Sequence, residues 1–257
     1  AMPHTGWPQR HRAKSGGDRQ DVMRIATFNV DSLDLPPRSE ISLDDRISIL
    51  RPQLERLRAD ILCLQEINGQ HVAAGGPRTL LALDKLLEGN IYQSYARAVS
   101  ASSPGSGVAD VHNLVTLSRW PILNFQSIRN TLVPLLSYRP LTSIPPAAEP
   151  LKIAFERPIL VADIEAAPGR VVTVINVHYR APIAAPIPGQ KENASVWRSV
   201  AGWAEGYAIA AWKRTAQALE TRLVIDGLLE TDASRFLIVA GDFNAEDHET
   251  PLKILIG

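Results

Sequence analysis

Short apolar runs alternate with longer stretches of helical periodicity along the first part of the chain. Residues 24–30 and 61–65 are apolar runs of the length expected for buried strands. Between them, apolar residues recur at intervals of three, four and three positions: Ile47, Leu50, Leu54 and Leu57. Either Asp44 or Asp45 suits the start of this helix as a cap, and Pro52 is expected to kink it or to mark its first turn. The order of strand, helix and strand is the unit of an α/β fold.

The same alternation continues through the rest of the chain. It predicts helices at residues 80–87, at 207–229 and from Thr250, and strands at 113–117, 159–163, 171–177 and 236–240. The second and third of these strands form a hairpin, because the turn-forming residues Pro168 and Gly169 separate them. The long helix has an apolar stripe that consists of Trp212, Ala216, Leu219 and Leu223. Residues 130–158 and 180–206 are expected to be irregular.

Length and composition favour a single domain. A chain of 257 residues, 45% of them hydrophobic, can bury one large α/β core. We expect residues 22–257 to form that domain and the polar residues 1–21, which contain several arginines, to be a disordered basic tail. No apolar run reaches the roughly 18 residues of a membrane span, and the first residues lack the apolar segment of a secretory signal. The expected location is therefore the cytoplasm.

The charge balance and the cysteine count narrow the classes of function. The chain has 27 Lys and Arg residues against 27 Asp and Glu residues, so its net charge is zero. This balance argues against a surface dedicated to nucleic acid, although a local basic groove is compatible with it. The single cysteine, Cys63, lies in an apolar run, cannot form an intrachain disulfide and leaves no cysteine cluster for zinc.

Polar residues with the chemistry of an active site lie at the ends of four of the predicted strands or directly after them. They are, in chain order, Asn29, Glu66, Asn176, His178, Asp242 and Asn244. Ligands of α/β sheets bind at the carboxyl ends of strands, so we expect these side chains to lie close together. Carboxylate and amide oxygens favour Mg²⁺ or Mn²⁺. Because Mg²⁺ takes only one or two carboxylates and completes its shell with water and phosphate oxygens, Glu66 as the main ligand indicates a phosphate substrate.

Five short motifs, in this order, resemble those of the endonuclease/exonuclease/phosphatase superfamily of metal-dependent phosphoesterases. They are Phe28-Asn29-Val30, Leu64-Gln65-Glu66-Ile67, Leu117-Ser118-Arg119-Trp120-Pro121-Ile122, Asn176-Val177-His178 and Gly241-Asp242-Phe243-Asn244. The resemblance extends from about Met23 to the end of the chain. It implies two mixed β-sheets packed face to face with helices on the outside, which is a four-layer sandwich.

The resemblance also implies roles for the residues on the metal side of the site. Glu66 would bind the metal ion directly, Asn29 would be a second ligand, and Asp242 would orient or deprotonate the attacking water. The residue types leave simpler alternatives open. Glu66 can be a surface carboxylate, Asn29 can stabilise an Asx-turn, and Asp242 follows a glycine in a sequence that favours turns.

On the substrate side, Asn244 would hydrogen-bond the scissile phosphate, and His178 would contact a phosphate oxygen or assist proton transfer. Asn176 would support the strand that carries His178. Arg157, directly before Pro158 and the hairpin, is a further candidate for a phosphate contact. The alternatives are that Asn244 stabilises a turn and that His178 is a hydrogen-bonded residue at a strand end.

The implied reaction is hydrolysis of a phosphodiester by metal-assisted in-line attack of water. A nuclease that acts on DNA or RNA is the first hypothesis. The second is a phosphatase or phospholipase that acts on a small or lipid phosphate ester, and the third is a non-catalytic remnant or binding module. A basic groove beside Glu66 and Asp242 would favour the first hypothesis, a deep narrow pocket the second, and a failure to bind Mg²⁺ the third.

One motif of the superfamily has no counterpart in this sequence. The members that the chain resembles carry a further strand pair, ending in an Asp-His pair, after the Gly-Asp-Phe-Asn motif. Asp247 and His248 follow Asn244 too closely, in the loop before the helix predicted at Thr250, so we do not expect them to substitute. The resemblance therefore predicts a domain whose last strands are missing at the C-terminus and whose hydrolytic activity alone is low or absent.

Other residues with chemical potential receive simpler interpretations. His71, His112 and His248 lie in predicted loops, and we expect each of them to be solvated. An aromatic group near the long helix either packs that helix onto the sheet or stacks on nucleic-acid bases, and we favour packing: Trp197, Trp203, Tyr207 and Trp212.

Overall fold

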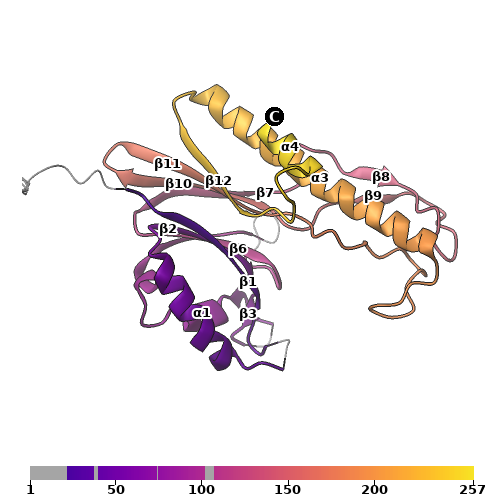
Figure 1. The fold of residues 1–257 in the computed structure, drawn as a ribbon, viewed down its shortest axis with the longest axis horizontal. Helices are drawn as coiled ribbons and strands as arrows, with labels where there is room; N and C mark the ends of the chain where they lie inside the picture. Colours follow the sequence, from indigo (N-terminus) through magenta and orange to yellow (C-terminus); the bar gives the residue numbers. More distant parts are fainter. Residues whose placement is uncertain (1–21, 38–39, 74, 102–106) are drawn as a thin grey trace, which may run out of the picture.

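The computed structural model describes residues 22–257 apart from 38–39, 74 and 102–106, so the tail predicted at residues 1–21 lies outside the described residues. Two four-stranded sheets pack face to face, and helices cover their outer faces (Figure 1). Each sheet combines parallel and antiparallel pairs. This arrangement confirms the α/β sandwich that the resemblance implies.

The strand order is β1-β2-β6-β5 in the first sheet and β12-β11-β10-β7 in the second. The first sheet consists of β1 (Ile25–Leu33), β2 (Ile61–Ile67), β5 (Ala96–Val99) and β6 (Asn113–Ser118). The second consists of β7 (Ile122–Ile128), β10 (Ile159–Ala167), β11 (Arg170–His178) and β12 (Phe236–Asp242). The hairpin of β10 and β11 turns at Pro168 and Gly169 as predicted, whereas β5 and β7 were not predicted because their short or exposed sequences lack a buried run.

Three apolar layers hold the sandwich together. Helices α1 (Leu43–Leu57) and α2 (Leu81–Leu87) pack on the first sheet, for example through Leu54 and Leu83. Cys63 and Val174 meet in the layer between the sheets. Helices α3 (Val200–Thr231) and α4 (Thr250–Ile256) cover the second sheet, with Val224 in contact with its strands. Within the described residues, no helix has the length and apolar character needed to cross a membrane.

Helix α1 matches its prediction except at its first residue. Ser42, rather than an aspartate, is the N-cap, and its hydroxyl accepts a hydrogen bond from the backbone N–H of Asp45 at 3.1 Å. Asp44 and Asp45 lie in the first turn, where a negative charge favours the helix dipole. Pro52 lies inside the helix. The expected buried face is present, and Leu54 is fully buried.

Helix α3 begins at Val200, earlier than the predicted residue 207, because Ser199 caps it by accepting a hydrogen bond from Gly202 N–H at 3.0 Å. The predicted apolar stripe is wrong in its second half, since Leu219 and Leu223 are 42% and 39% exposed. The face that packs inward carries polar side chains instead: Arg214, Gln217, Glu220 and Thr221 are all buried. Apolar periodicity does not identify a face of this kind.

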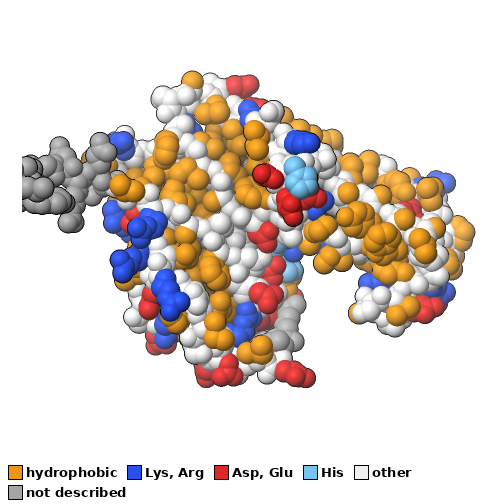
Figure 2. Space-filling model, viewed as in Figure 1, with side chains coloured by type: hydrophobic (Ala, Val, Ile, Leu, Met, Phe, Trp, Pro, Cys, Tyr) orange, Lys and Arg blue, Asp and Glu red, His pale blue; other side chains and the backbone are white. Residues whose placement is uncertain are grey.

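The first half of α3 extends beyond the sheets together with two short strands and forms a projecting arm (Figure 1). The strands are β8 (Leu136–Tyr138) and β9 (Leu151–Ile153), which lie in the stretch predicted to be irregular. Apolar side chains gather along the surface of this arm (Figure 2). Trp212 is packed, but against side chains such as Ile153 and Phe155 and not against the four-stranded sheets as predicted. Trp203 and Tyr207 stack on each other at 5.3 Å and remain partly exposed.

Two glutamates of α3 fix the irregular stretch to the helix. Glu220 accepts four backbone hydrogen bonds from residues 130–133, at 2.6 to 3.3 Å, and is fully buried. Glu205 accepts hydrogen bonds from the backbone and hydroxyl of Thr142, from Leu141 N–H and from the hydroxyl of Tyr138. The backbone of the irregular stretch therefore obtains from side chains the hydrogen bonds that it lacks in a sheet.

Candidate active site

The parallel strand pairs place the predicted site residues at one edge of the sandwich. Asn29 in β1 lies beside Gln65 in β2, and His178 in β11 lies beside Asp242 in β12. Strands β1 and β12 approach each other across the two sheets. The carboxyl ends of all four strands therefore meet, as expected from their polar endings.

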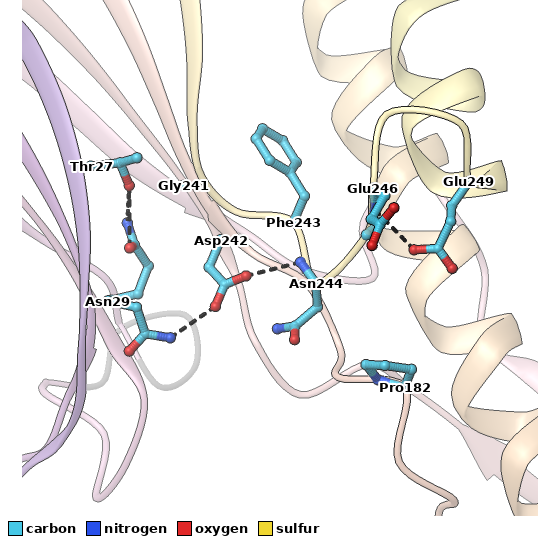
Figure 3. A pocket seen from close by; sticks show the side chains of 11 residues that line it. Thr27, Asn29, Pro182, Gly241, Asp242, Phe243, Asn244, Glu246 and Glu249 are labelled. Atoms are coloured by element: carbon cyan, nitrogen blue, oxygen red, sulfur yellow. Dashed lines mark hydrogen bonds between the residues drawn. The ribbon is translucent and has the colours of Figure 1, made fainter.

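Two carboxylates face each other across the side chain of Asn29. Asn29 Nδ2 donates to Glu66 Oε1 at 3.2 Å and to Asp242 Oδ2 at 2.8 Å. Figure 3 shows the second of these bonds at the floor of a cavity. One amide group thus holds two negative charges close together, an arrangement that a bound cation would stabilise.

The backbone around Asn29 and Glu66 is locally strained. Glu66 has a φ of 63°, and Asp31 and Ser32 have φ values of 54° and 53°, in the left-handed region that residues with a Cβ rarely adopt. These turns allow the backbone N–H and the hydroxyl of Ser32 to donate to Glu66 Oε2 at 3.0 and 3.1 Å. Asn29 Oδ1 accepts from Asp31 N–H at 2.9 Å, so the Asx-turn interpretation of Asn29 holds together with its contacts to the carboxylates.

Asp242 and Asn244 form a turn directly after β12. Asp242 Oδ1 accepts from Asn244 N–H at 2.9 Å, and Asn244 Nδ2 donates to the carbonyl of Tyr179 at 3.0 Å. The Asp242 side chain is 31% exposed. The turn therefore fixes the Asp242 carboxylate at the edge of the cavity and in contact with solvent.

His178 lies beneath the two carboxylates. Its Nε2 is 3.5 Å from Glu66 Oε1 and 3.6 Å from Asp242 Oδ2, and its side chain is only 1% exposed. Burial, and then the positive charge of Arg157, lower the pKa of His178 to about 3, so the ring is neutral at physiological pH. Its Nδ1 is buried and has no hydrogen-bond partner among the described residues.

Glu66 keeps its negative charge. Burial alone raises the pKa of a carboxyl group, but the hydrogen bonds from Asn29 and Ser32 and the proximity of His178 lower the pKa of Glu66 below its ordinary value. Arg157 lies nearby and donates from Nη1 to the carbonyl of Tyr179 at 2.6 Å. Burial lowers the pKa of Arg157, although a guanidinium group remains charged in proteins.

Asn176 does not reach the cavity. It is fully buried between the sheets, where its Nδ2 donates to the carbonyls of Leu64 and Val115 at 3.3 and 3.1 Å. Its Oδ1 accepts from Gln65 Nε2 at 2.9 Å, and Gln65 Nε2 also donates to Thr27 Oγ1 at 3.0 Å. These contacts join the two sheets directly below the carboxylates, so Asn176 has a supporting position.

Several residues around the site carried no signal in the sequence. Gln217 on α3 donates to the carbonyls of Arg157 and His178, and Arg214 Nη1 donates to the carbonyl of Asn244 at 2.7 Å. His112, expected to be solvated, is half-buried instead, and its ring centroid lies 6.2 Å from that of His178. The spacing of Arg214 and Gln217 on one helix face was visible, but nothing distinguished them from polar residues on an exposed face.

The site opens to a cavity of about 480 Å³ (Figure 3). Its lining comes from β1, β2 and the segment after β12: Thr27, Asn29, Gln65, Pro182, Gly241, Asp242, Phe243, Asn244, Ala245, Glu246 and Glu249. The described residues contain no cluster of three or more His, Cys, Asp and Glu side chains suited to a metal. Glu66 and Asp242 nevertheless fit Mg²⁺, since this ion needs only one or two carboxylates when water and phosphate oxygens complete its shell.

Comparisons with known proteins agree with this geometry. The model of the Endonuclease/Exonuclease/phosphatase family matches residues 26–255. A comparison with curated proteins found no match. Among solved structures, a protein of the same family from Bacteroides thetaiotaomicron has a TM-score of 0.55 at 12% identity, over 91% of this chain and 66% of its own.

Two further structures are similar at the level of the fold. A β-hairpin deletion mutant of beta toxin from Staphylococcus aureus has a TM-score of 0.54 at 15% identity, over 91% of this chain and 71% of its own. A mannosyl-6-phosphatase from Bacteroides thetaiotaomicron has a TM-score of 0.51 at 12% identity, over 91% of this chain and 70% of its own.

Proposed function

Because the chain belongs to the endonuclease/exonuclease/phosphatase family, whose members hydrolyse phosphate esters, we propose that it is a Mg²⁺-dependent phosphodiesterase that acts as a nuclease on DNA or RNA. One observation carries the proposal: a single amide of Asn29 holds the Glu66 and Asp242 carboxylates together, and Asn29 and Asp242 line a cavity. Such a pair of charges suits a divalent cation and a phosphate better than a neutral ligand.

In this proposal, Glu66 would hold Mg²⁺ or Mn²⁺ through its carboxylate, and Asn29 would be the neighbouring ligand through its amide oxygen Oδ1. The Nδ2 of Asn29 fixes the position of Glu66. When bound, the ion supplies positive charge that stabilises the phosphoryl group as it is attacked. The Ser32 contacts keep both oxygens of Glu66 oriented. Support by neighbouring groups of this kind is typical of metal ligands.

Asp242 is the residue that orients or deprotonates the attacking water. Its carboxylate is accessible from the cavity, and its two oxygens are fixed by Asn29 and Asn244. Asn244 lines the same cavity, and in this proposal it donates to the scissile phosphate. Because His178 is buried and its Nε2 lies 3.5 and 3.6 Å from the two carboxylates, its proposed role is to position them.

A second candidate is a phosphatase or phospholipase that acts on a small or lipid phosphate ester. The rim of the cavity carries Glu246 and Glu249, whose negative charges oppose a long polyanion more than a compact substrate. A mannosyl-6-phosphatase with a similar fold is compatible with this alternative.

A panel of substrates separates these proposals: plasmid DNA, RNA, an abasic duplex, a chromogenic phosphodiester and a sugar phosphate, each with Mg²⁺, Mn²⁺ or EDTA. Cleavage of DNA or RNA that requires the metal ion supports the nuclease. Turnover of the sugar phosphate alone supports the second candidate. If no substrate is hydrolysed with either metal, the third hypothesis, a non-catalytic binding module, replaces both.

A further inference from the structure

A second, smaller cavity of about 190 Å³ lies next to the proposed active site. It is lined by Ser100, Ala101, Ala109, Asp110, Val111, His112, Arg129, Glu156, Arg157 and Pro158. Two of these residues connect it to the site. The ring of His112 packs edge-to-face on that of His178 at 6.2 Å, and the charge of Arg157 acts on Glu66, Asp242 and His178.

The two carboxylates of this cavity already have cationic partners. Asp110 forms an ion pair with Arg78 at 2.8 Å, and Glu156 forms one with Lys213. These pairs neutralise the negative charge at the rim of the cavity. Among the residues that line this cavity, the carboxylates of Asp110 and Glu156 are therefore already paired.

The two arginines, by contrast, have no carboxylate partner among the described residues. Arg129 Nη1 donates to the carbonyl of Glu156 at 2.9 Å, and Arg157 Nη1 donates to the carbonyl of Tyr179 at 2.6 Å. A guanidinium group has five N–H donors, so most of the donors of both side chains are available to a ligand. Two positive charges that line the same small cavity attract an anion, and arginine suits phosphate because its planar fork matches two phosphate oxygens.

The wall of the cavity strengthens this attraction. Ala101, Ala109, Val111 and Pro158 contribute small apolar surfaces to this wall. Electrostatic interactions are stronger beside apolar surface than in open water. His112 adopts a φ of 59°, and its backbone N–H donates to Asn68 Oδ1 at 3.1 Å, which holds this strained residue between the cavity and His178.

We propose that this cavity, with Arg129 and Arg157 as its cationic groups and His112 at its boundary with the site, binds a second phosphate group of the substrate. The proposal rests on the proposed function, because it takes the first phosphate to be bound at Glu66 and Asp242. It specifies the substrate class as a molecule with two phosphate groups in neighbouring positions, as in a polynucleotide backbone, instead of an isolated phosphate ester. Arg129 is the residue that distinguishes the two classes.

Calorimetric binding of thymidine 3′,5′-bisphosphate and thymidine 5′-monophosphate, in the presence of Mg²⁺, tests the proposal. We expect the wild-type protein to bind the bisphosphate about tenfold more tightly, which corresponds to ~1.4 kcal/mol. The Arg129→Ala variant should lose most of this preference, and Arg129→Lys should keep part of it. Arg119→Ala removes an exposed arginine that pairs with Asp60 away from the cavity, so it should keep the full preference.

The result is independent of turnover and therefore separates this inference from the proposed function. Equal binding of both nucleotides by the wild type, or a preference that persists in Arg129→Ala, overturns the second subsite. If the preference depends on Arg129 but no phosphodiester is hydrolysed in the substrate panel, the subsite stands and the nuclease proposal fails. Circular dichroism of each variant verifies that the fold is intact.

Discussion

Two pairs of carboxylates in this molecule accept hydrogen bonds in different ways. Glu205 and Glu220 on α3 each accept several hydrogen bonds from residues between 130 and 142. Glu66 and Asp242 at the strand ends share the Asn29 amide as a donor and lie close to each other. A carboxylate whose oxygens accept several hydrogen bonds holds a backbone segment in place. Two carboxylates that share one donor keep negative charge that a cation can neutralise. Four substitutions test this contrast.

The largest effect is expected at Asp242. If the protein hydrolyses phosphodiesters, Asp242→Asn should lower kcat by ~10²–10⁴-fold, the usual loss when a general base is removed. The melting temperature should change little, because the amide oxygen can keep the hydrogen bond from Asn244 N–H, and water can reach the donor that is released at this 31% exposed side chain. Steady-state kinetics with Asp226→Asn as the control, an exposed aspartate paired with Arg222, measures this effect. A loss confined to KM would contradict the role of Asp242.

Glu220→Gln should have the largest effect on stability. A glutamine at this buried position offers one acceptor oxygen where the carboxylate offers two, so some of the N–H groups of residues 130–133 lose their partner. Unpaired buried donors cost about 2–4 kcal/mol in total. Urea unfolding measures the loss, with the exposed Glu230→Gln on the same helix as the control. Equal stability of the two variants would show that Glu220 does not fix the loop.

Glu66→Gln tests whether the carboxylate pair of Glu66 and Asp242 binds a cation. The substitution should weaken Mg²⁺ binding by at least about tenfold, the range seen even for groups that only support a ligand. It should not destabilise the fold, since removal of one negative charge relieves the repulsion between Glu66 and Asp242. Calorimetric titration of Mg²⁺, with Glu55→Gln on the exposed side of α1 as the control, gives the comparison. An unchanged Mg²⁺ affinity would exclude Glu66 as the main ligand.

The smallest effect is expected at Glu205 and depends on pH. Burial raises the pKa of Glu205, but hydrogen bonds from Thr142, Leu141 and Tyr138 lower it overall below its ordinary value of 4.5. The stability that Glu205 contributes is therefore complete above about pH 4.5 and decreases as the pH falls through its lowered pKa. The difference in unfolding free energy between the wild type and Glu205→Gln should be present at pH 7 and smaller at pH 3. A difference in unfolding free energy that is constant over this range would contradict the contribution of Glu205. The control is Glu192→Gln, at an exposed position before α3.

The same contrast explains how much of the fold was predictable. Helix α1 attaches to its sheet through apolar side chains such as Leu54, so its periodicity identified the buried face. Helix α3 attaches through apolar residues such as Val224 but also through the buried polar residues Arg214 and Gln217. Periodicity assigned Leu219 and Leu223 to the wrong side. A polar residue that satisfies a distant backbone has the same sequence signature as one that faces solvent. Tertiary contacts of this kind are not encoded in local patterns.

The sequence predicted which residues lie at the candidate site, but it predicted few of the hydrogen bonds and ring contacts that they form. Polar residues after apolar strands identified Glu66 and Asp242, because strand ends converge on one edge of a sheet. The contribution of Ser32 depends on two successive left-handed residues in β1, which neither the motif nor its composition indicates. His112 comes next to His178 only because two strands far apart in the sequence become neighbours in space. Asn176 follows the strand pattern as well, yet its side chain faces the interior between the sheets.

The way in which α3 holds the irregular stretch also bears on how this protein can change. Glu205 and Glu220 bind mainly the backbone N–H groups of residues 130–133 and 141–142, and a backbone N–H is present in every residue except proline. Leu132 and Leu141, whose backbones are held in this way, have side chains that are 47% and 83% exposed. Substitutions at these two positions can therefore alter the surface chemistry of the arm while its path stays fixed. Natural or designed substitutions at these positions can therefore change the side chains that the arm presents to solvent without destabilising the fold.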